Sequence, residues 1–290
     1  MRRTTFGTVL ALAVLTGLFW FSPASAGNIW LTGHDADFHC AFGSQCNHFG
    51  IALDFARQDA PDKTKPLLFL DSGGELAAAA GSAVARAKNT VEGAGSAFPF
   101  IVMDPTAAGF AALPLTTASF SAIVIASDST CGGCDNDAAD IAAINARTAA
   151  ITDFFNAGGG LVYLSGAGNR DIYYDSVPIP ATAVAVSPPF SLTPDGVALG
   201  LLDPEDTDCC ATHNSFSLPG AGSALKVAEL DSSGFAETLF AGDVTIGGGG
   251  FEPSCGGPTG PPCPVPSPAA LLLLGPALVA VGYGQWRRRK

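Results

Sequence analysis

The sequence predicts an α/β domain with a mostly parallel, open sheet and helices on both faces. Residues 122–126 and 161–164 are short apolar runs rich in β-branched residues, which is typical of strands buried on two faces. Apolar residues between these runs recur at helical spacing: Ile141, Ile144, Ile151, Phe154 and Phe155. A strand, helix, strand order requires a parallel crossover connection, so this unit is the centre of the predicted fold.

The central unit is expected to contain one helix. Asn136 or Asp137 can cap its start, and three glycines at 158–160 end it. Upstream, strands are expected at 28–31, 66–70 and 98–103, with helices at 47–57 and 75–88 between them. This alternation is typical of doubly wound sheets. Downstream, we expect a strand at 181–186 and a hairpin of two strands, 224–230 and 238–246, at an edge of the sheet.

Composition indicates a folded chain with an acidic surface. Of the 290 residues, 48% are hydrophobic and only 14% are charged, which argues against disorder. The formal net charge is -12, but six basic residues lie at the two ends of the chain. Between those ends the chain has eight basic and twenty-six acidic residues, which gives a formal charge of about −18. Such a surface repels nucleic acids and anionic lipid headgroups.

The first 26 residues are expected to be a signal peptide. Arg2 and Arg3 precede an apolar run at 9–21, and Ala24 to Ala26 form a small-residue cleavage site. The alternative is an N-terminal membrane anchor, for which the apolar run is short. Cleavage would leave Gly27 as the first residue and implies the Sec translocase and signal peptidase as partners.

All eight cysteines lie between the terminal segments, which favours disulfides in an exported chain. Close spacing favours three local pairs: Cys40 with Cys46, Cys131 with Cys134, and Cys255 with Cys263. The adjacent Cys209 and Cys210 have no evident partner. For the Cys131-x-x-Cys134 spacing, a redox pair and half a zinc site are the alternatives to a structural disulfide.

Candidate site residues follow the predicted strands, because ligands of open α/β sheets bind beside the carboxyl ends of strands. His34, Asp35 and Asp37 follow the first strand, Ser165 follows the strand at 161–164, and His213 lies beside an acidic run. For His34, Asp35 and Asp37 the alternative is a solvated loop. For Ser165 it is a tight turn, and for His213 it is a histidine that only orders its loop.

Four aspartates around the central loop form a weak calcium candidate: Asp128, Asp135, Asp137 and Asp140. Their spacing lacks the register of a calcium-binding loop. Helix capping by Asp137, with Asp140 in the first turn, accounts for two of them without a metal. No other cofactor is indicated.

The C-terminal segment resembles the PEP-CTERM sorting signal of Gram-negative bacteria. Residues 247–264 are a linker rich in Gly and Pro, followed by Val265, Pro266, Ser267 and Pro268. Eighteen mostly apolar residues, 269–286, are just long enough for a transmembrane helix, and a basic cluster at 287–290 ends the chain. Ser267 stands where that family usually has Glu. The alternative is a permanent C-terminal anchor.

The PEP-CTERM resemblance implies export across the inner membrane and transient anchoring there. Cleavage near Pro266 by an exosortase would follow, with release to the cell surface or the medium. Proteins of that class are associated with extracellular polysaccharide.

Residues 28–230 resemble the class I glutamine amidotransferase-like fold, a flavodoxin-type α/β fold, and especially its ThuA-like branch. The similarity is carried by residues 32–35, 123–125 and 154–162. Amidotransferases place a cysteine nucleophile in a Gly-rich turn after a strand, and the corresponding turn here, 164–168, has no cysteine. Ser215 also occupies the place of Glu in that family's His-x-Glu pair, so the resemblance does not imply amidotransferase chemistry.

The sequence therefore predicts an exported, surface-sorted protein with a non-catalytic α/β domain at 27–246. One alternative is a secreted hydrolase of envelope carbohydrate that uses Ser165 or an acidic loop with His213. Another is a calcium-dependent adhesion module.

Overall fold

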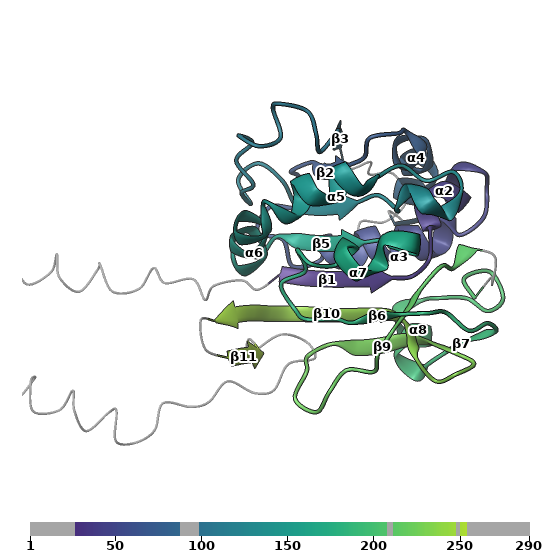
Figure 1. Ribbon diagram of the computed structural model, residues 1–290. Helices are drawn as coiled ribbons and strands as arrows, with labels where there is room; N and C mark the ends of the chain where they lie inside the picture. Colours follow the sequence, from purple (N-terminus) through teal and green to yellow (C-terminus); the bar gives the residue numbers. More distant parts are fainter. Residues whose placement is uncertain (1–26, 88–98, 208–210, 248–249, 254–290) are drawn as a thin grey trace, which may run out of the picture. The chain divides into compact units, whose positions relative to one another are not determined.

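The centre of the fold is an eleven-stranded mixed sheet (Figure 1). The computed structural model describes residues 27–87, 99–207, 211–247 and 250–253. The predicted signal peptide, the sorting segment, Cys209, Cys210 and the Cys255–Cys263 pair lie outside these residues. So does most of the predicted linker, although the short strand β11 (Gly250–Pro253) falls within its bounds. In the described part of the chain, none of the helices has the length and apolar character that crossing a membrane requires.

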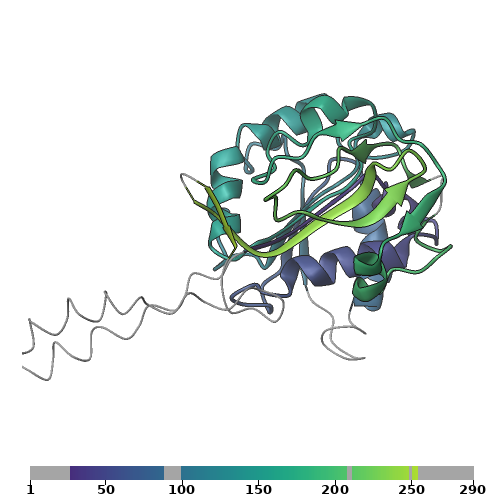
Figure 2. The same ribbon diagram turned by 90° about the horizontal axis from the view of Figure 1, so that it is seen from below.

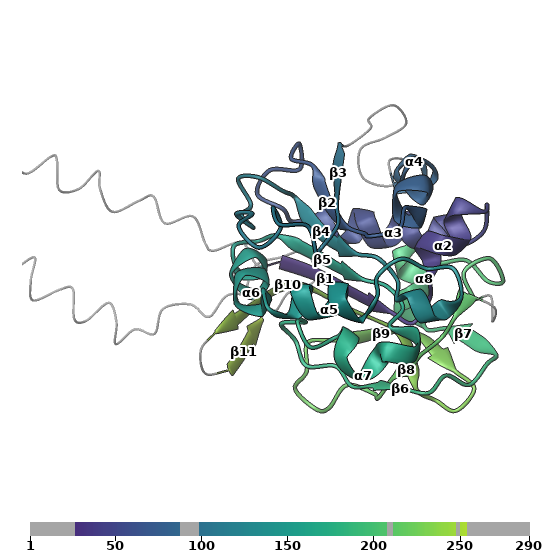
Figure 3. The ribbon, with the colours of Figure 1, turned by 45° about the horizontal axis from the view of Figure 1, so that its top comes forward.

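Five parallel strands form one half of the sheet. They are β1 (Gly27–Thr32), β2 (Leu67–Leu70), β3 (Phe100–Met103), β4 (Ala122–Ile125) and β5 (Gly160–Tyr163). Their spatial order is β3-β2-β4-β5-β1, and every neighbouring pair in it is parallel (Figure 3). The predicted α/β class with an open, mostly parallel sheet and helices is confirmed.

The other half of the sheet is antiparallel. Strand β10 (Ala236–Gly247) pairs with β9 (Lys226–Asp231) on one side, and on the other side with β1 and, beyond the end of β1, with β8 (Ser215–Phe216). Three short strands complete it: β6 (Ala183–Val184) pairs with β8, β7 (Phe190–Leu192) pairs with β9, and β11 pairs with β10.

The predicted late hairpin exists as β9 and β10, but β10 does not lie at an edge of the sheet. It is inserted next to β1, because β1 is buried along its whole length and needs a hydrogen-bonding partner on that side. The strand expected at 181–186 is reduced to the two residues of β6.

Helices cover both faces of the parallel half (Figure 2). One face carries α2 (Ala36–Ala41), α3 (Cys46–Arg57) and α4 (Glu75–Ala87). The opposite face carries α5 (Ala138–Asn145), α6 (Thr148–Asn156) and α7 (Arg170–Tyr173). The strands contribute alternate residues to the two cores: in β1, Ile29 and Leu31 belong to one and Trp30 to the other.

The single helix expected between β4 and β5 is two helices, α5 and α6. The break has a local cause, because the Thr148 hydroxyl donates a 2.7 Å hydrogen bond to the Asn145 carbonyl and replaces a backbone donor. It also has a distant cause: the Arg147 guanidinium binds the carbonyl oxygens of Phe110 and Leu113, in the segment before β4. The apolar face that the spacing predicts is retained across both helices.

Candidate functional site

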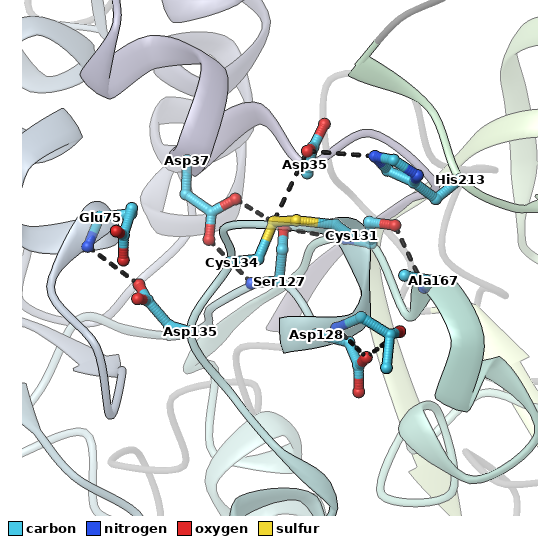
Figure 4. The surroundings of a disulfide bond; sticks show 12 residues. Asp35, Asp37, Glu75, Ser127, Asp128, Cys131, Cys134, Asp135, Ala167 and His213 are labelled. Carbon is cyan, nitrogen blue, oxygen red and sulfur yellow. Dashed lines mark hydrogen bonds and ion pairs between the residues drawn. A yellow bond between two sulfur atoms is a disulfide. The ribbon is translucent and has the colours of Figure 1, made fainter.

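The turns at the carboxyl ends of β1, β4 and β5 bring together most of the residues that the sequence singles out (Figure 4). We call this group of side chains the crevice, because it occupies the place where open α/β sheets bind ligands. Asp35 and Asp37 come from the turn after β1 and from α2, while Ser127 and the disulfide of Cys131 and Cys134 follow β4. Ser165 follows β5. The observed arrangement therefore agrees with the rule that places ligand crevices at the carboxyl ends of parallel strands.

His213 joins this crevice through backbone pairing. The Asp35 amide donates to the Ala211 carbonyl at 2.8 Å, and the His213 amide donates to the Gly33 carbonyl at 2.9 Å. As a result, His213 Nε2 lies 3.2 Å from Asp35 Oδ2, and the side chain of His213 is 28% exposed. A second histidine, His39, approaches the other carboxylate oxygen, with Nε2 3.6 Å from Asp35 Oδ1.

The disulfide between Cys131 and Cys134 lies against the same carboxylate. The Cys134 sulfur is 3.5 Å from Asp35 Oδ2. Two of the three predicted disulfides are present, this one and Cys40–Cys46. Because a disulfide sulfur is not a thiolate, the closed Cys131–Cys134 pair offers neither a nucleophile nor a zinc ligand.

Asp37 fixes the turn after β4 from a fully buried position. Its carboxylate accepts hydrogen bonds from the Ser127 amide at 2.8 Å and from the Ser127 hydroxyl at 2.6 Å. Burial outweighs these two bonds and raises the pKa of Asp37 to about 6. The Ser127 oxygen in turn accepts from the Ser165 amide at 3.3 Å, so Asp37 ties together the turns of three strands.

The turn after β5 is closed to ligands by the protein's own side chains. Gly166 N donates to Tyr174 Oη at 3.1 Å and to Asn214 Oδ1 at 3.0 Å, and Ala167 N donates to Ser165 Oγ at 3.2 Å. Gly168 N donates to Thr130 Oγ1 at 2.6 Å. Ser165 is fully buried. Although both residues are described, no hydrogen bond joins Ser165 to His213.

Ala167 lies in the left-handed region, with φ of 40°, where residues other than glycine are uncommon. In the described chain Gln45 is the only other such residue. Strained positions of this kind cluster at functional turns. Here the strained residue has a methyl side chain and brings no reactive group.

The four aspartates of the calcium hypothesis serve as caps. Asp128 accepts from the amide and hydroxyl of Thr130, and Asp135 accepts from three backbone amides at the start of α4. Asp137 and Asp140 form the capping box of α5. Burial, with the Glu75 and Asp71 carboxyl groups next in importance, raises the pKa of Asp135. Calcium binding here remains a prediction.

His34 is not part of the crevice, although the sequence groups it with Asp35. Its side chain is fully buried on the other side of the turn, among His48, Glu229 and Glu237. These three residues were not expected from the sequence. A glutamate inside an apolar strand pattern, as in residues 226–231 and 236–240, is the signal that could have identified two of them.

A pocket of about 430 Å³ lies away from the crevice. It is lined by residues 179–182 and by the segment between β8 and β9, and its lining contains no Asp, Glu, His or Cys. Its position therefore adds nothing to the chemistry of the crevice.

The chain matches no family model, no curated protein and no solved structure.

Proposed function

We propose that this chain is an exported protein, sorted to the bacterial surface, whose α/β domain acts in the envelope without turning over a substrate. Its partners in this proposal are the Sec translocase, signal peptidase and an exosortase, and its setting is the cell surface and its extracellular polysaccharide. The Cys40–Cys46 and Cys131–Cys134 disulfides are consistent with an oxidising compartment, since disulfides persist mainly outside the cytosol.

The observation that carries the non-catalytic part is the occupied turn after β5. An acyl-transfer enzyme of this architecture needs a nucleophile at the turn and a free amide beside it to stabilise an oxyanion. Here the strained position is Ala167, and the next amide, Gly168 N, is held by the Thr130 hydroxyl at 2.6 Å. Both requirements are missing at the same place.

The class I glutamine amidotransferase-like fold, a flavodoxin-type α/β fold, is part of this proposal. Flavodoxin-like sheets have the strand order 2-1-3-4-5. Numbered from β2, the strands β3-β2-β4-β5 follow the order 2-1-3-4, and β1 takes the fifth place. The strand order of the sheet therefore supports the proposed fold in a permuted form. The fifth place of the sheet, which the last strand takes in flavodoxin-like folds, is taken here by β1, the first strand of the chain.

A secreted hydrolase is the second candidate, favoured by the contact between His213 and Asp35. A histidine 3.2 Å from a buried carboxylate has the arrangement of a general base and its orienting acid. A nucleophile for this pair would have to come from Ser165, which is buried and accepts a hydrogen bond from Ala167 N.

The experiment is complementation of a deletion strain with His213→Ala and Ser165→Ala variants. We expect both to restore wild-type colony morphology and surface polysaccharide, because neither side chain turns over a substrate. A variant with residues 287–290 replaced by serine is the control and should fail, since the tail's basic cluster would be lost. If either alanine variant accumulates normally, melts like the wild type and yet loses the phenotype, the hydrolase candidate replaces the proposal.

A calcium-dependent adhesion module is tested separately. Calcium that binds the folded state alone raises its melting temperature. A melting temperature of the purified chain that is the same in calcium and in chelator would remove this candidate.

A further inference from the structure

Four ionisable side chains meet in the interior without contact with solvent. They come from four elements: His34 from the turn after β1, His48 from α3, Glu229 from β9 and Glu237 from β10. Each is completely buried. Their nearest nitrogen and oxygen atoms all lie within 4.8 Å of one another.

Three of the six distances between these atoms match those between ligands that share one metal ion, and all six are at most 4.8 Å. His34 Nε2 is 3.0 Å from Glu237 Oε2 and 3.3 Å from Glu229 Oε2, and His48 Nε2 is 3.3 Å from Glu229 Oε2. Ligands about 2.0–2.1 Å from a tetrahedral zinc ion are about 3.3–3.4 Å apart. The side chains therefore converge closely enough to hold an ion without rearranging the strands.

The two carboxylates of the cluster are buried together without a lysine or an arginine from the described part of the chain. Among the described residues, their only ion-pair partners are the two histidines. The Thr238 hydroxyl lies 2.8 Å from Glu229 Oε2 and 2.5 Å from Glu237 Oε2, although its single proton can serve only one of them. Burying an uncompensated carboxylate is expensive, so a cation or extra protons must complete the group.

Polar atoms at the cluster are also unsatisfied. His34 Nε2, His48 Nδ1 and Glu229 Oε1 are fully buried, and none has a hydrogen-bond partner in the described part of the chain. Buried polar atoms without a partner are rare and call for an explanation such as an ion. Of the three, His34 Nε2 is the atom that faces both carboxylates, at ion-pair distance, and an ion between them would partner it. An ion at the same place would not reach His48 Nδ1, because Nε2 is the atom of that ring that faces Glu229.

The surroundings hold the four side chains in place, as an outer shell does around a metal. Thr212 Oγ1 is 2.6 Å from His34 Nδ1, which leaves Nε2 as the atom that faces the carboxylates. Gly33 N and Thr32 Oγ1 both donate to Glu237 Oε1, at 2.9 and 3.2 Å. The register of β10 shifts between Ala236 and Thr238, and such a bulge re-aims the side chain it contains, here Glu237.

We propose that His34, His48, Glu229 and Glu237 form a structural binding site for one zinc ion. Two imidazoles and two carboxylates are ligands that zinc accepts in tetrahedral sites. All four side chains are buried, so the site is closed and the ion stabilises the junction of the parallel and antiparallel halves of the sheet. Its loading accompanies folding.

The rival explanation is a cluster neutralised by protons alone. Burial by itself lowers the pKa of His34, but the Glu237 and Glu229 carboxylates outweigh it and raise that pKa well above its usual value. An imidazolium with one protonated glutamate would also be neutral. Metal content and ligand type distinguish the two explanations directly.

The test uses the full chain, purified without chelators, and zinc as the only added metal. We expect one tightly held zinc ion per chain by elemental analysis, and a lower melting temperature after zinc is removed by unfolding in chelator and refolding. X-ray absorption at the zinc edge should show only nitrogen and oxygen ligands, about 2.0–2.1 Å away. Sulfur ligands at about 2.3 Å would place the zinc on cysteines and overturn the proposal.

Variants assign the site. Glu229→Gln and His48→Gln should each weaken zinc binding by more than about 100-fold, which exceeds the usual effect of outer-shell changes. Matched controls are Glu205→Gln and His39→Gln, which remove the same groups from outside the cluster and should keep full zinc content. The proposal is refuted if the full-length wild type binds no zinc and gains no thermal stability from it. This result is obtained on the wild type alone, so it does not depend on whether any variant folds.

Discussion

The buried carboxylate of Asp37 makes the stability of the fold depend on pH in a predictable direction. Burial raises the pKa of Asp37 from 3.8 to about 6 in the folded chain. A group whose pKa is higher in the folded state than in the unfolded state stabilises the fold fully below its unfolded pKa. That contribution is lost as the pH rises through the folded pKa. Asp37 should therefore destabilise the protein progressively between about pH 4 and pH 7.

The size of the effect follows from the shift. A difference of about two pKa units corresponds to about 3 kcal/mol in the free energy of unfolding. Asp37→Asn removes the charge and keeps the shape. The asparagine oxygen can accept from the Ser127 amide, and its NH₂ group can donate to the Ser127 hydroxyl oxygen. Compared with the wild type, the variant should gain up to about 3 kcal/mol between pH 4 and pH 7.5.

Urea unfolding of the purified full chain at several pH values measures this difference. Asp153→Asn, at an exposed position on α6, is the control for the general effect of removing one negative charge. The reasoning is refuted if the stability difference between Asp37→Asn and the wild type stays constant from pH 4 to pH 7.5. It is also refuted if rising pH favours the wild type.

Four further variants test a close contact and its control, a disulfide and a helix cap. Gly160→Ala places a methyl group 1.9 Å from a backbone carbonyl oxygen of α3 and should lower the free energy of unfolding in urea by about 3 kcal/mol or more. Gly81→Ala has open space around it and should raise that free energy by about 0.5–1 kcal/mol, because alanine favours the helical conformation of α4. Equal effects of the two would contradict the close contact of β5 with α3. Replacing both Cys40 and Cys46 by alanine should cost about 2 kcal/mol, and no change on reduction of the wild type would argue against that disulfide. Asp137→Ala, which removes the capping box of α5, should lower the free energy of unfolding by about 1 kcal/mol; an unchanged value would mean that the cap is not formed in solution.

The parallel half of the fold could be predicted because its strands are short apolar runs with turn residues after them. Strands β2, β4 and β5 are buried at every residue, as their sequences indicate. The break between α5 and α6 could not be predicted, since Arg147 binds carbonyls more than thirty residues away. The place of β10 beside β1 also depends on a distant partner, and local patterns do not encode the partner of a strand.

The crevice was partly predictable for the same reason. Asp35 and Ser165 follow strands that end at the same edge of the sheet, so their loops had to meet. His213 joins them because residues 211–213 pair with the turn after β1, which no local pattern indicates. The buried cluster lies beyond such reasoning: His34 and Glu237 are 203 residues apart and meet because β10 is inserted beside β1.

The intact mass of the protein, recovered from its host's envelope and medium before and after reduction and alkylation, tests the proposed function most directly. Export and sorting predict a chain that begins at Gly27, ends near Pro266 and takes up alkylating agent at Cys40, Cys46, Cys131 and Cys134 only after reduction. A chain that retains residues 287–290 would be a permanently anchored protein, and a chain alkylated at these four cysteines before reduction would not have matured in an oxidising compartment. Either result would contradict the proposal.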